Sequence, residues 1–232
     1  MEKPTFEVGR LGGPVNPATD IIPGTNRHLM AVNTGVSITG ADRSGAALTS
    51  MDAPLISLGE PGLWKYSMDY VPAKASVFVN LYNNMWNTNF PYWTEGSWSE
   101  RVRIWGIQPG AKITENLAVQ SWETRLPLMG VKAGGMGTKL PSQQKGIAVS
   151  RKGVLVTAFG QDPDGNKGTL LRLWEEAGVH GKVKVTLPKG TNFSKAQPVD
   201  LRGEKAGEPV EITARSFEID LGAYAPESFI LK

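Results

Sequence analysis

Residues 80–98 contain the side chains of this sequence that are best suited to binding a ligand. Amide and aromatic side chains lie side by side here, and the predicted site consists of Asn83, Asn84, Trp86, Asn87, Asn89, Tyr92, Trp93, Glu95 and Trp98. Flat aromatic rings beside amides suit a sugar, which has apolar C–H faces and hydroxyl groups at its edge. Asn also hydrogen-bonds the local backbone in turns, and Trp and Tyr also fill cores. We therefore predict carbohydrate contacts in this segment, with a structural role for the same residues as the alternative.

Six positions carry carboxylates near the ends of predicted strands. They are Asp52, Glu95, Glu100, Glu123, Glu175 and Glu176. Glycoside hydrolysis uses two carboxyl groups, roughly 5 Å apart in retaining enzymes and about 6.5–9.5 Å apart in inverting ones. Sequence spacing does not measure that separation, and surface carboxylates are common. No catalytic residue is therefore predicted, although a pair among these six remains a hypothesis.

The sequence predicts no metal site and no cofactor. His28 and His180 stand in no ligand spacing, and the chain has no cysteine. Asp162-x-Asp164-x-Asn166 resembles the start of a calcium loop, but Lys167 stands where that loop has Gly and Leu173 where it has Glu. A hairpin turn is the better interpretation of this motif.

Composition excludes several classes of function. The chain has 232 residues and a formal net charge of +3, and its lysines and arginines are spread out, whereas a nucleic-acid-binding surface needs a concentrated basic face. No apolar run reaches membrane-spanning length, and the first residues lack the basic start and apolar core of a signal peptide. We expect a soluble protein that binds neither nucleic acid nor membrane, and its compartment is not predicted.

Short strands must position the segment described above. The 27 Gly and 16 Pro indicate many turns, and an alternating pattern predicts strands at 77–82 and 99–107, paired with each other around the segment. A further strand is predicted at 117–128, and short apolar runs between turns predict strands at 146–149, 154–159, 169–174, 182–187, 210–214 and 216–221. No stretch keeps a convincing helical period. The predicted fold is an all-β, large, mainly antiparallel β-sandwich of supersandwich or jelly-roll type.

The expected organisation is a single domain over residues 1–232. Residues 1–27, rich in Gly and Pro, are predicted to be an extended, irregular lead-in. The loop at 130–144 is the best place for a boundary, if the chain has one.

Three segments carry a resemblance to a known family. They are Asp52-Ala53-Pro54-Leu55, Phe78-Val79-Asn80-Leu81-Tyr82-Asn83-Asn84-Met85-Trp86-Asn87-Thr88-Asn89-Phe90 and Leu171-Arg172-Leu173-Trp174-Glu175-Glu176-Ala177-Gly178. The sequence resembles, from about residue 36 onward, the C-terminal β-sandwich region of α-mannosidase-like glycoside hydrolases, those of family 38 and its relatives. In that family, catalysis belongs to an N-terminal α/β barrel with an Asp nucleophile and zinc ligands, and nothing in this sequence matches them. The resemblance therefore implies the fold and an association with carbohydrate, without the mechanism.

The leading hypothesis is a carbohydrate-active, non-catalytic β-sandwich module that supports or binds carbohydrate for a glycosidase. One alternative is a small stand-alone glycosidase that uses two of the carboxylates above, so whether the chain is an enzyme stays open. Another is a purely structural domain that packs on a catalytic domain. The expected partners are carbohydrate and either a catalytic barrel domain or a second copy of the chain.

Overall fold

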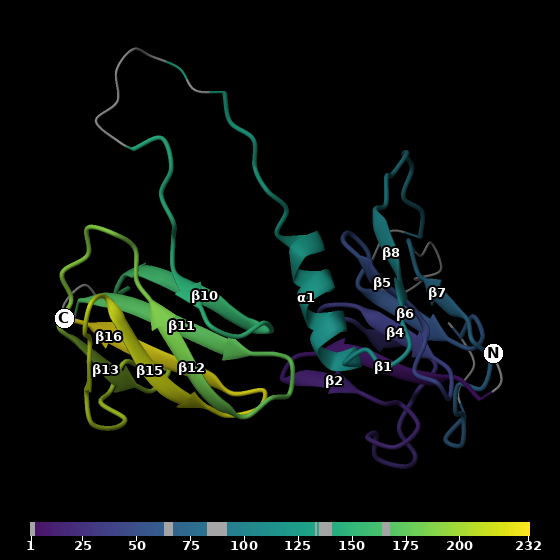
Figure 1. Ribbon diagram of the computed structural model, residues 1–232. Helices are drawn as coiled ribbons and strands as arrows, with labels where there is room; N and C mark the ends of the chain where they lie inside the picture. The colour runs from purple at the N-terminus through teal and green to yellow at the C-terminus, as the bar shows by residue number, and fades with distance from the viewer. Residues whose placement is uncertain (1–2, 63–66, 83–91, 133, 135–140, 164–167) are drawn as a thin grey trace. The chain divides into compact units, whose positions relative to one another are not determined.

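The computed structural model of the protein describes residues 3–62, 67–82, 92–132, 134, 141–163 and 168–232. Almost all of its regular structure is strand (Figure 1). The elements are, in chain order, β1 (Thr5–Arg10), β2 (Gly13–Val15), β3 (Met30–Ala31), β4 (Val36–Thr39), β5 (Gly45–Ser50), β6 (Leu55–Leu58), β7 (Val77–Val79), β8 (Val102–Ile107), α1 (Ile113–Arg125), β9 (Ala148–Val149), β10 (Val154–Gln161), β11 (Thr169–Glu175), β12 (Gly181–Thr186), β13 (Lys195–Val199), β14 (Val210–Glu211), β15 (Ser216–Leu221) and β16 (Pro226–Leu231). The described strands pair antiparallel in four sheets, which is the all-β, mainly antiparallel fold that the sequence predicts.

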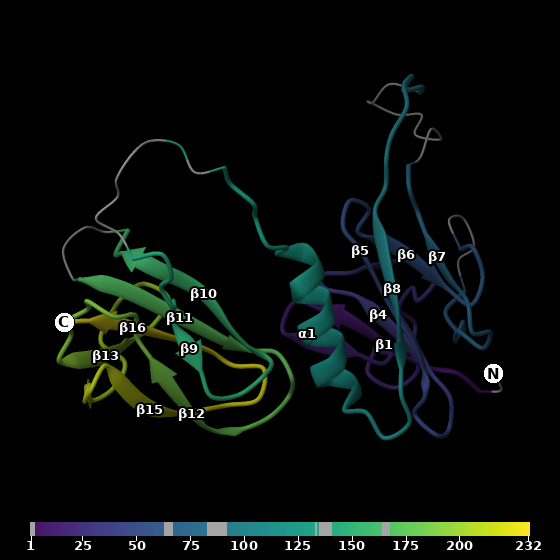
Figure 2. The same ribbon diagram turned by 45° about the horizontal axis from the view of Figure 1, so that its top comes forward.

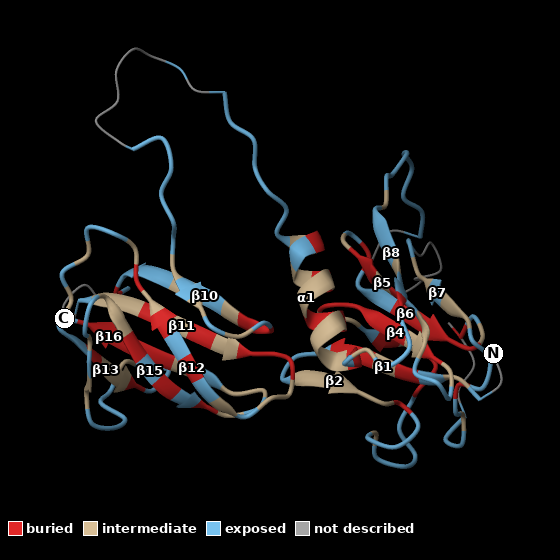
Figure 3. Cartoon of the chain, in the orientation of Figure 1, coloured by how far each residue is buried: buried red, intermediate tan, exposed pale blue. Residues whose placement is uncertain are grey.

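The chain divides into two compact units, an N-terminal unit (Met1–Pro127) and a C-terminal unit (Leu128–Lys232). Figure 3 shows that buried positions follow the strands within each unit. Each unit therefore has a core of its own.

The N-terminal unit contains a five-stranded sheet, in the order β2-β1-β4-β5-β8, and a three-stranded sheet, in the order β3-β6-β7. One buried cluster has members from both sheets: Phe6, Val8, Met30, Val36, Ile56 and Leu58. Because side chains alternate along β4 and β5, every second one lies on the face of the larger sheet opposite to this cluster. There Ala47 and Ile107 pack against Ile113 and Leu117 of α1. Figure 2 shows the helix beside the larger sheet.

The C-terminal unit is a β-sandwich. Its sheets run in the orders β10-β11-β16-β13-β14 and β15-β12-β9. Their inner faces share one buried cluster, which consists of Val154, Leu171, Leu173, Val183, Val185, Leu187, Ala196, Phe217, Ile219, Leu221, Phe229 and Leu231. The short apolar runs that predict strands in this half of the sequence are confirmed, and β13 is an additional strand. The sequence pattern does not indicate β13, because it contains Pro198, which lacks a backbone N–H group and argues against a strand.

The strand predicted at 117–128 is wrong, because these residues lie mainly in α1. The buried face of the helix includes the polar residues Ser121 and Thr124, which interrupt the apolar stripe by which a helix is recognised. Thr49 donates a hydrogen bond to Ser121 (2.8 Å between the hydroxyl oxygens), and Arg103 donates one to Thr124 (2.9 Å). A polar helix face can therefore be buried here, because residues of the neighbouring strands supply its hydrogen-bond partners.

Two other predictions about this half of the chain are corrected. Strand 99–107 does not pair with strand 77–82, because β8 pairs with β5 and β7 pairs with β6. Alternation identifies a strand but carries no information about its neighbour. The irregular lead-in predicted at 1–27 contains β1 and β2, and Phe6 and Val8 of β1 are core residues. The Gly and Pro residues that follow β1 conceal this short alternation.

Candidate functional site

The predicted binding segment is described in part. Asn83, Asn84, Trp86, Asn87 and Asn89 lie outside the described residues, so their contacts stay predictions. Tyr92, Trp93, Glu95 and Trp98 are described, and all four are exposed.

Trp98 stacks on Tyr82, which sequence reasoning did not include in the site. The two ring centroids lie 5.2 Å apart with an interplanar angle of 28°. Both side chains are half exposed or more, at 64% for Tyr82 and 50% for Trp98. Gly96 lies against the same Trp98 ring, since a Cβ atom at this glycine would be 3.6 Å from it. The stack is therefore a defined aromatic surface that is open to solvent.

The segment starts at β7 and returns at β8, and both ends are held to neighbouring strands. After β7, the backbone N–H of Asn80 donates to the carbonyl of Leu55 (2.9 Å). Before β8, the backbone N–H of Met51 donates to the carbonyl of Arg101 (2.9 Å). These bonds fix the positions from which Tyr82 and Trp98 project.

Asp52 reinforces the second of these ends. Its carboxylate accepts hydrogen bonds from the Arg101 backbone N–H (2.9 Å), from Nε (3.0 Å) and from Nη2 (2.7 Å). The Arg101 side chain, and then its backbone N–H, lower the pKa of Asp52 to about 2. A bidentate pair of this kind fixes geometry more than it adds stability at an exposed site. Asp52 is therefore an anchor for the start of β8.

Glu175 has a structural role in the C-terminal unit. Its side chain is fully buried and accepts hydrogen bonds from the backbone N–H groups of Ala177 (3.1 Å), Gly178 (2.8 Å) and Tyr224 (3.0 Å). Arg151 lies 3.9 Å away and forms an ion pair with it. The carboxylate thus joins the turn after β11 to the chain before β16.

The other candidate carboxylates are dispersed. Glu95 and Glu123 are exposed, on the aromatic segment and on α1, and Glu100 is half buried just before β8. Glu176 is buried next to Glu175 in the other unit. Among the residues that the structure describes, no group of three or more His, Asp or Glu side chains could hold a metal ion.

The two histidines lie in unlike surroundings. His28 is buried and stacks on Tyr70 at 3.9 Å between ring centroids, whereas His180 is exposed and lies 3.4 Å from Asp220. The Asp162 motif begins a hairpin in which the Asp162 N–H donates to the Gly168 carbonyl, and 164–167 lie outside the described residues. In the described parts of the chain, no helix is long and apolar enough to cross a membrane.

Comparison with known proteins gives a likeness of fold. No protein-family model and no curated protein sequence matches the chain. An α-mannosidase from Enterococcus faecalis V583 matches with a TM-score of 0.62 and 10% identity, over 100% of this chain and 24% of that one. A glycosyl hydrolase family 38 protein from Enterococcus faecalis matches with a TM-score of 0.60 and 11% identity, over 100% of this chain and 25% of that one.

The chain thus spans about a quarter of the length of the solved structures that it matches. At this level of identity, the likeness establishes the fold alone. The resemblance to α-mannosidase-like glycoside hydrolases, which the sequence motifs indicate, is confirmed for the fold.

Proposed function

We propose that this chain is a non-catalytic β-sandwich module of an α-mannosidase-like glycoside hydrolase and that it binds carbohydrate through the aromatic segment 82–98. The observation that carries the proposal is the likeness of fold over the whole chain to a quarter of two such enzymes. Because the chain corresponds to only about a quarter of each of these proteins, the likeness supports a role beside a catalytic domain.

The aromatic surface supports carbohydrate as the ligand. Tyr82 and Trp98 present stacked rings to solvent, and Tyr92 and Trp93 are exposed at 66% and 67%. Large exposed aromatics in one segment of a protein mark an interaction surface. A sugar ring can lay its C–H face on such rings, while its hydroxyl groups reach amides and carboxylates of the same segment.

The stand-alone glycosidase is the less supported alternative. A general acid must carry a proton near neutral pH, whereas the pKa of Asp52 is lowered to about 2 by Arg101. Glu175 is fully buried and accepts three backbone N–H groups, which leaves it poorly placed to reach a substrate. The purely structural alternative, a domain whose aromatic segment packs on a catalytic domain, requires that the isolated chain bind no sugar.

Isothermal titration with mannose-, galactose- and glucose-containing oligosaccharides tests the proposal. We expect heat with at least one of them and a clear loss of affinity for Trp98→Ala. Leu201→Ala is the matched control, because Leu201 is exposed at 73% in the other unit. No heat with any sugar would favour the structural alternative. Turnover of nitrophenyl glycosides that Glu95→Gln abolishes would favour the glycosidase.

A further inference from the structure

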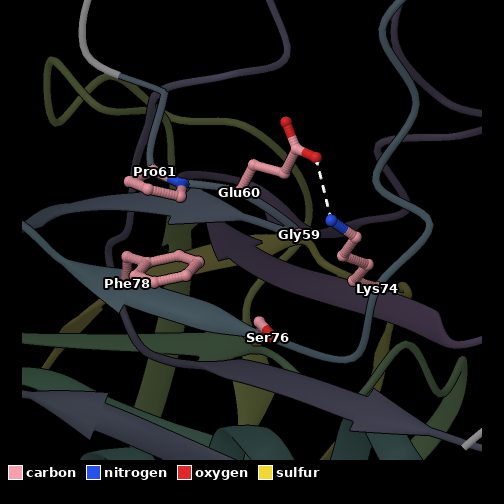
Figure 4. Close-up of a pocket in the computed structure, with 6 residues that line it drawn as sticks. All are labelled: Gly59, Glu60, Pro61, Lys74, Ser76 and Phe78. Carbon is pink, nitrogen blue, oxygen red and sulfur yellow. Dashed lines mark hydrogen bonds and ion pairs between the residues drawn. The ribbon is translucent and has the colours of Figure 1, made fainter.

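A shallow hollow lies on the N-terminal unit, beside the sheet β3-β6-β7. Its volume is ≈ 480 Å³, within the range of small-molecule sites. The residues that line it are Gly59, Glu60, Pro61, Lys74, Ser76 and Phe78 (Figure 4). None of them belongs to the binding segment that the sequence predicts.

The strand geometry of β7 explains why an aromatic ring lies here. Val77 and Val79 pack against the core between the two sheets. Since side chains alternate along a strand, Ser76 and Phe78 project from the opposite face. Phe78 is 37% exposed there although it is surrounded by apolar neighbours in sequence.

A turn at the end of β6 forms the other wall of the hollow. Gly59 has φ +76°, and a Cβ atom at this position would lie 2.7 Å from the Tyr70 hydroxyl and 3.4 Å from Pro72. Glycine is therefore required, and it directs the following Glu60 and Pro61 toward the hollow.

The hollow is apolar on one side and polar on the other. Figure 4 shows Phe78 and Pro61 on one side, with Glu60 and Lys74 opposite them. Lys74 Nζ lies 3.1 Å from Glu60 Oε1, and the Ser76 side chain lies between the two sides. The ion pair leaves the lining with no net charge. A ligand of this hollow therefore needs an apolar face, no strong charge, and groups that both donate and accept hydrogen bonds.

A neutral sugar ring has these three properties. We propose that this hollow is a second carbohydrate subsite, which holds one pyranose residue of a neutral oligosaccharide. The C–H face of the ring lies on Phe78, one hydroxyl donates to Glu60, and a hydroxyl oxygen accepts from Lys74. This inference rests on the proposed function and adds a site at the other end of the same stretch of chain.

The two sites are close enough to share one ligand. Phe78 and Tyr82 are four residues apart, and an extended chain advances at most about 3.3–3.6 Å per residue. Their Cα atoms are thus no more than about 14 Å apart. An oligosaccharide of a few residues can reach from Phe78 to the stack of Tyr82 and Trp98.

Titration of the whole chain with an α-linked mannotriose and a glucose-based trisaccharide tests the subsite. Loss of one aromatic stacking contact corresponds to about three- to tenfold weaker binding, which we expect for Phe78→Ala. Glu60→Gln and Lys74→Ala change side chains that are 37% and 71% exposed and lie outside β7, so they report on binding even if Phe78→Ala disturbs that strand. Both should weaken binding, whereas Leu201→Ala should not. A trisaccharide of galacturonic acid should bind less well than the neutral probes, because a lining with no net charge does not compensate the loss of water from its carboxylates.

The outcomes separate failure of the subsite from failure of the proposed function. If Trp98→Ala weakens binding while Phe78→Ala, Glu60→Gln and Lys74→Ala all bind like the unmodified chain, the subsite is wrong and the proposed function stands. If the unmodified chain binds neither these probes nor a galactose-containing oligosaccharide, both are wrong. Tighter binding of the galacturonate than of the neutral sugars would overturn the assignment of a neutral ligand.

Discussion

Asp52 and Glu175 both accept hydrogen bonds from several N–H groups, and both hold loops in place. Asp52 binds the backbone and the guanidinium of Arg101 at the start of β8. Glu175 binds three backbone N–H groups inside the C-terminal unit. From sequence alone these two residues were candidates for acid–base chemistry, but their partners give each a positioning role.

Asp52 should make the stability of the N-terminal unit depend on acidic pH. A carboxyl group whose folded-state pKa is lowered, here from 3.8 to about 2, stabilises the folded state above the higher value and loses that contribution as the pH falls toward the lower one. Asp52→Asn should therefore lower the melting temperature slightly at pH 6 and have a smaller effect at pH 2, where about half of the folded-state carboxyls are protonated. Thermal unfolding at both pH values checks this, with Asp69→Asn, at an exposed position of the same unit, as the control. An equal effect at pH 2 would contradict the mechanism.

Glu175→Ala should strongly destabilise the C-terminal unit. Three backbone N–H groups and Arg151 would lose a fully buried acceptor, and we expect a loss of about 3 kcal/mol or more in the free energy of unfolding. Glu175→Gln retains one acceptor oxygen and should be intermediate. Urea unfolding measures the difference, with Glu218→Gln as a control on an exposed ion pair and an expected loss within about 0.5 kcal/mol. Equal stability of Glu175→Ala and Glu218→Gln would refute the structural role.

At the scale of elements, α1 lies close to the larger sheet of the N-terminal unit and is joined to it by polar contacts. Trp105 of β8 donates its indole N–H to Asn116 (2.8 Å), and Arg125 donates to the carbonyl of Ser50 (2.9 Å). Ser121 approaches Thr49 near Gly35, where the chain enters β4. The helix therefore depends on small and polar side chains rather than on a wide apolar stripe.

Gly35→Ala should separate α1 from the sheet. A Cβ atom at this glycine would lie 2.6 Å from the Leu48 carbonyl oxygen, the Ser121 hydroxyl and the Thr49 hydroxyl, and a backbone oxygen has little room to move. We expect a loss of about 1–3 kcal/mol, typical of overpacking. Gly106→Ala in β8 is the matched control, because nothing lies within 4 Å of its Cβ position. Chemical unfolding of both variants compares them, and equal stability would mean that the contact at Gly35 is not tight.

At the scale of the whole molecule, the chain consists of two units with separate cores. The residues that join them begin with an extended stretch in which Leu128, Met129 and Val131 are each at least 88% exposed. The sequence predicts one domain, with the loop at 130–144 as the best place for a boundary, and the structure divides after Pro127.

Brief proteolysis with thermolysin, which cuts on the N-terminal side of Leu, Met and Val rather than after Trp and Tyr, should cut near Leu128 and Met129 and leave two folded pieces. Exposed chain without regular structure is the preferred site of cleavage. Mass spectrometry identifies the cut, and circular dichroism of the separated pieces measures whether each keeps its strands. Cleavage first within β11 or β12, or pieces that unfold on separation, would contradict two independent units.

Alternation and turn residues were sufficient to predict an all-β, mainly antiparallel fold and most strands of the C-terminal unit, because most inward side chains of its strands are apolar. They also predicted a binding segment around Trp98, and its described members Tyr92, Trp93, Glu95 and Trp98 are exposed, whereas binding itself is still a prediction. The Asn residues of that segment lie outside the described residues, and their role is still a prediction from sequence.

Only the tertiary structure decided which elements meet. The buried face of α1 carries Ser121 and Thr124, whose partners Thr49 and Arg103 are distant in sequence, so no local pattern indicates that burial. For the same reason, the sequence did not indicate the neighbour of β8, the partners of Asp52 and Glu175 or the hollow beside Phe78. A sequence records the preferences of each residue, whereas a polar group becomes suitable for burial, or a ring becomes part of a site, only when the fold supplies its partners.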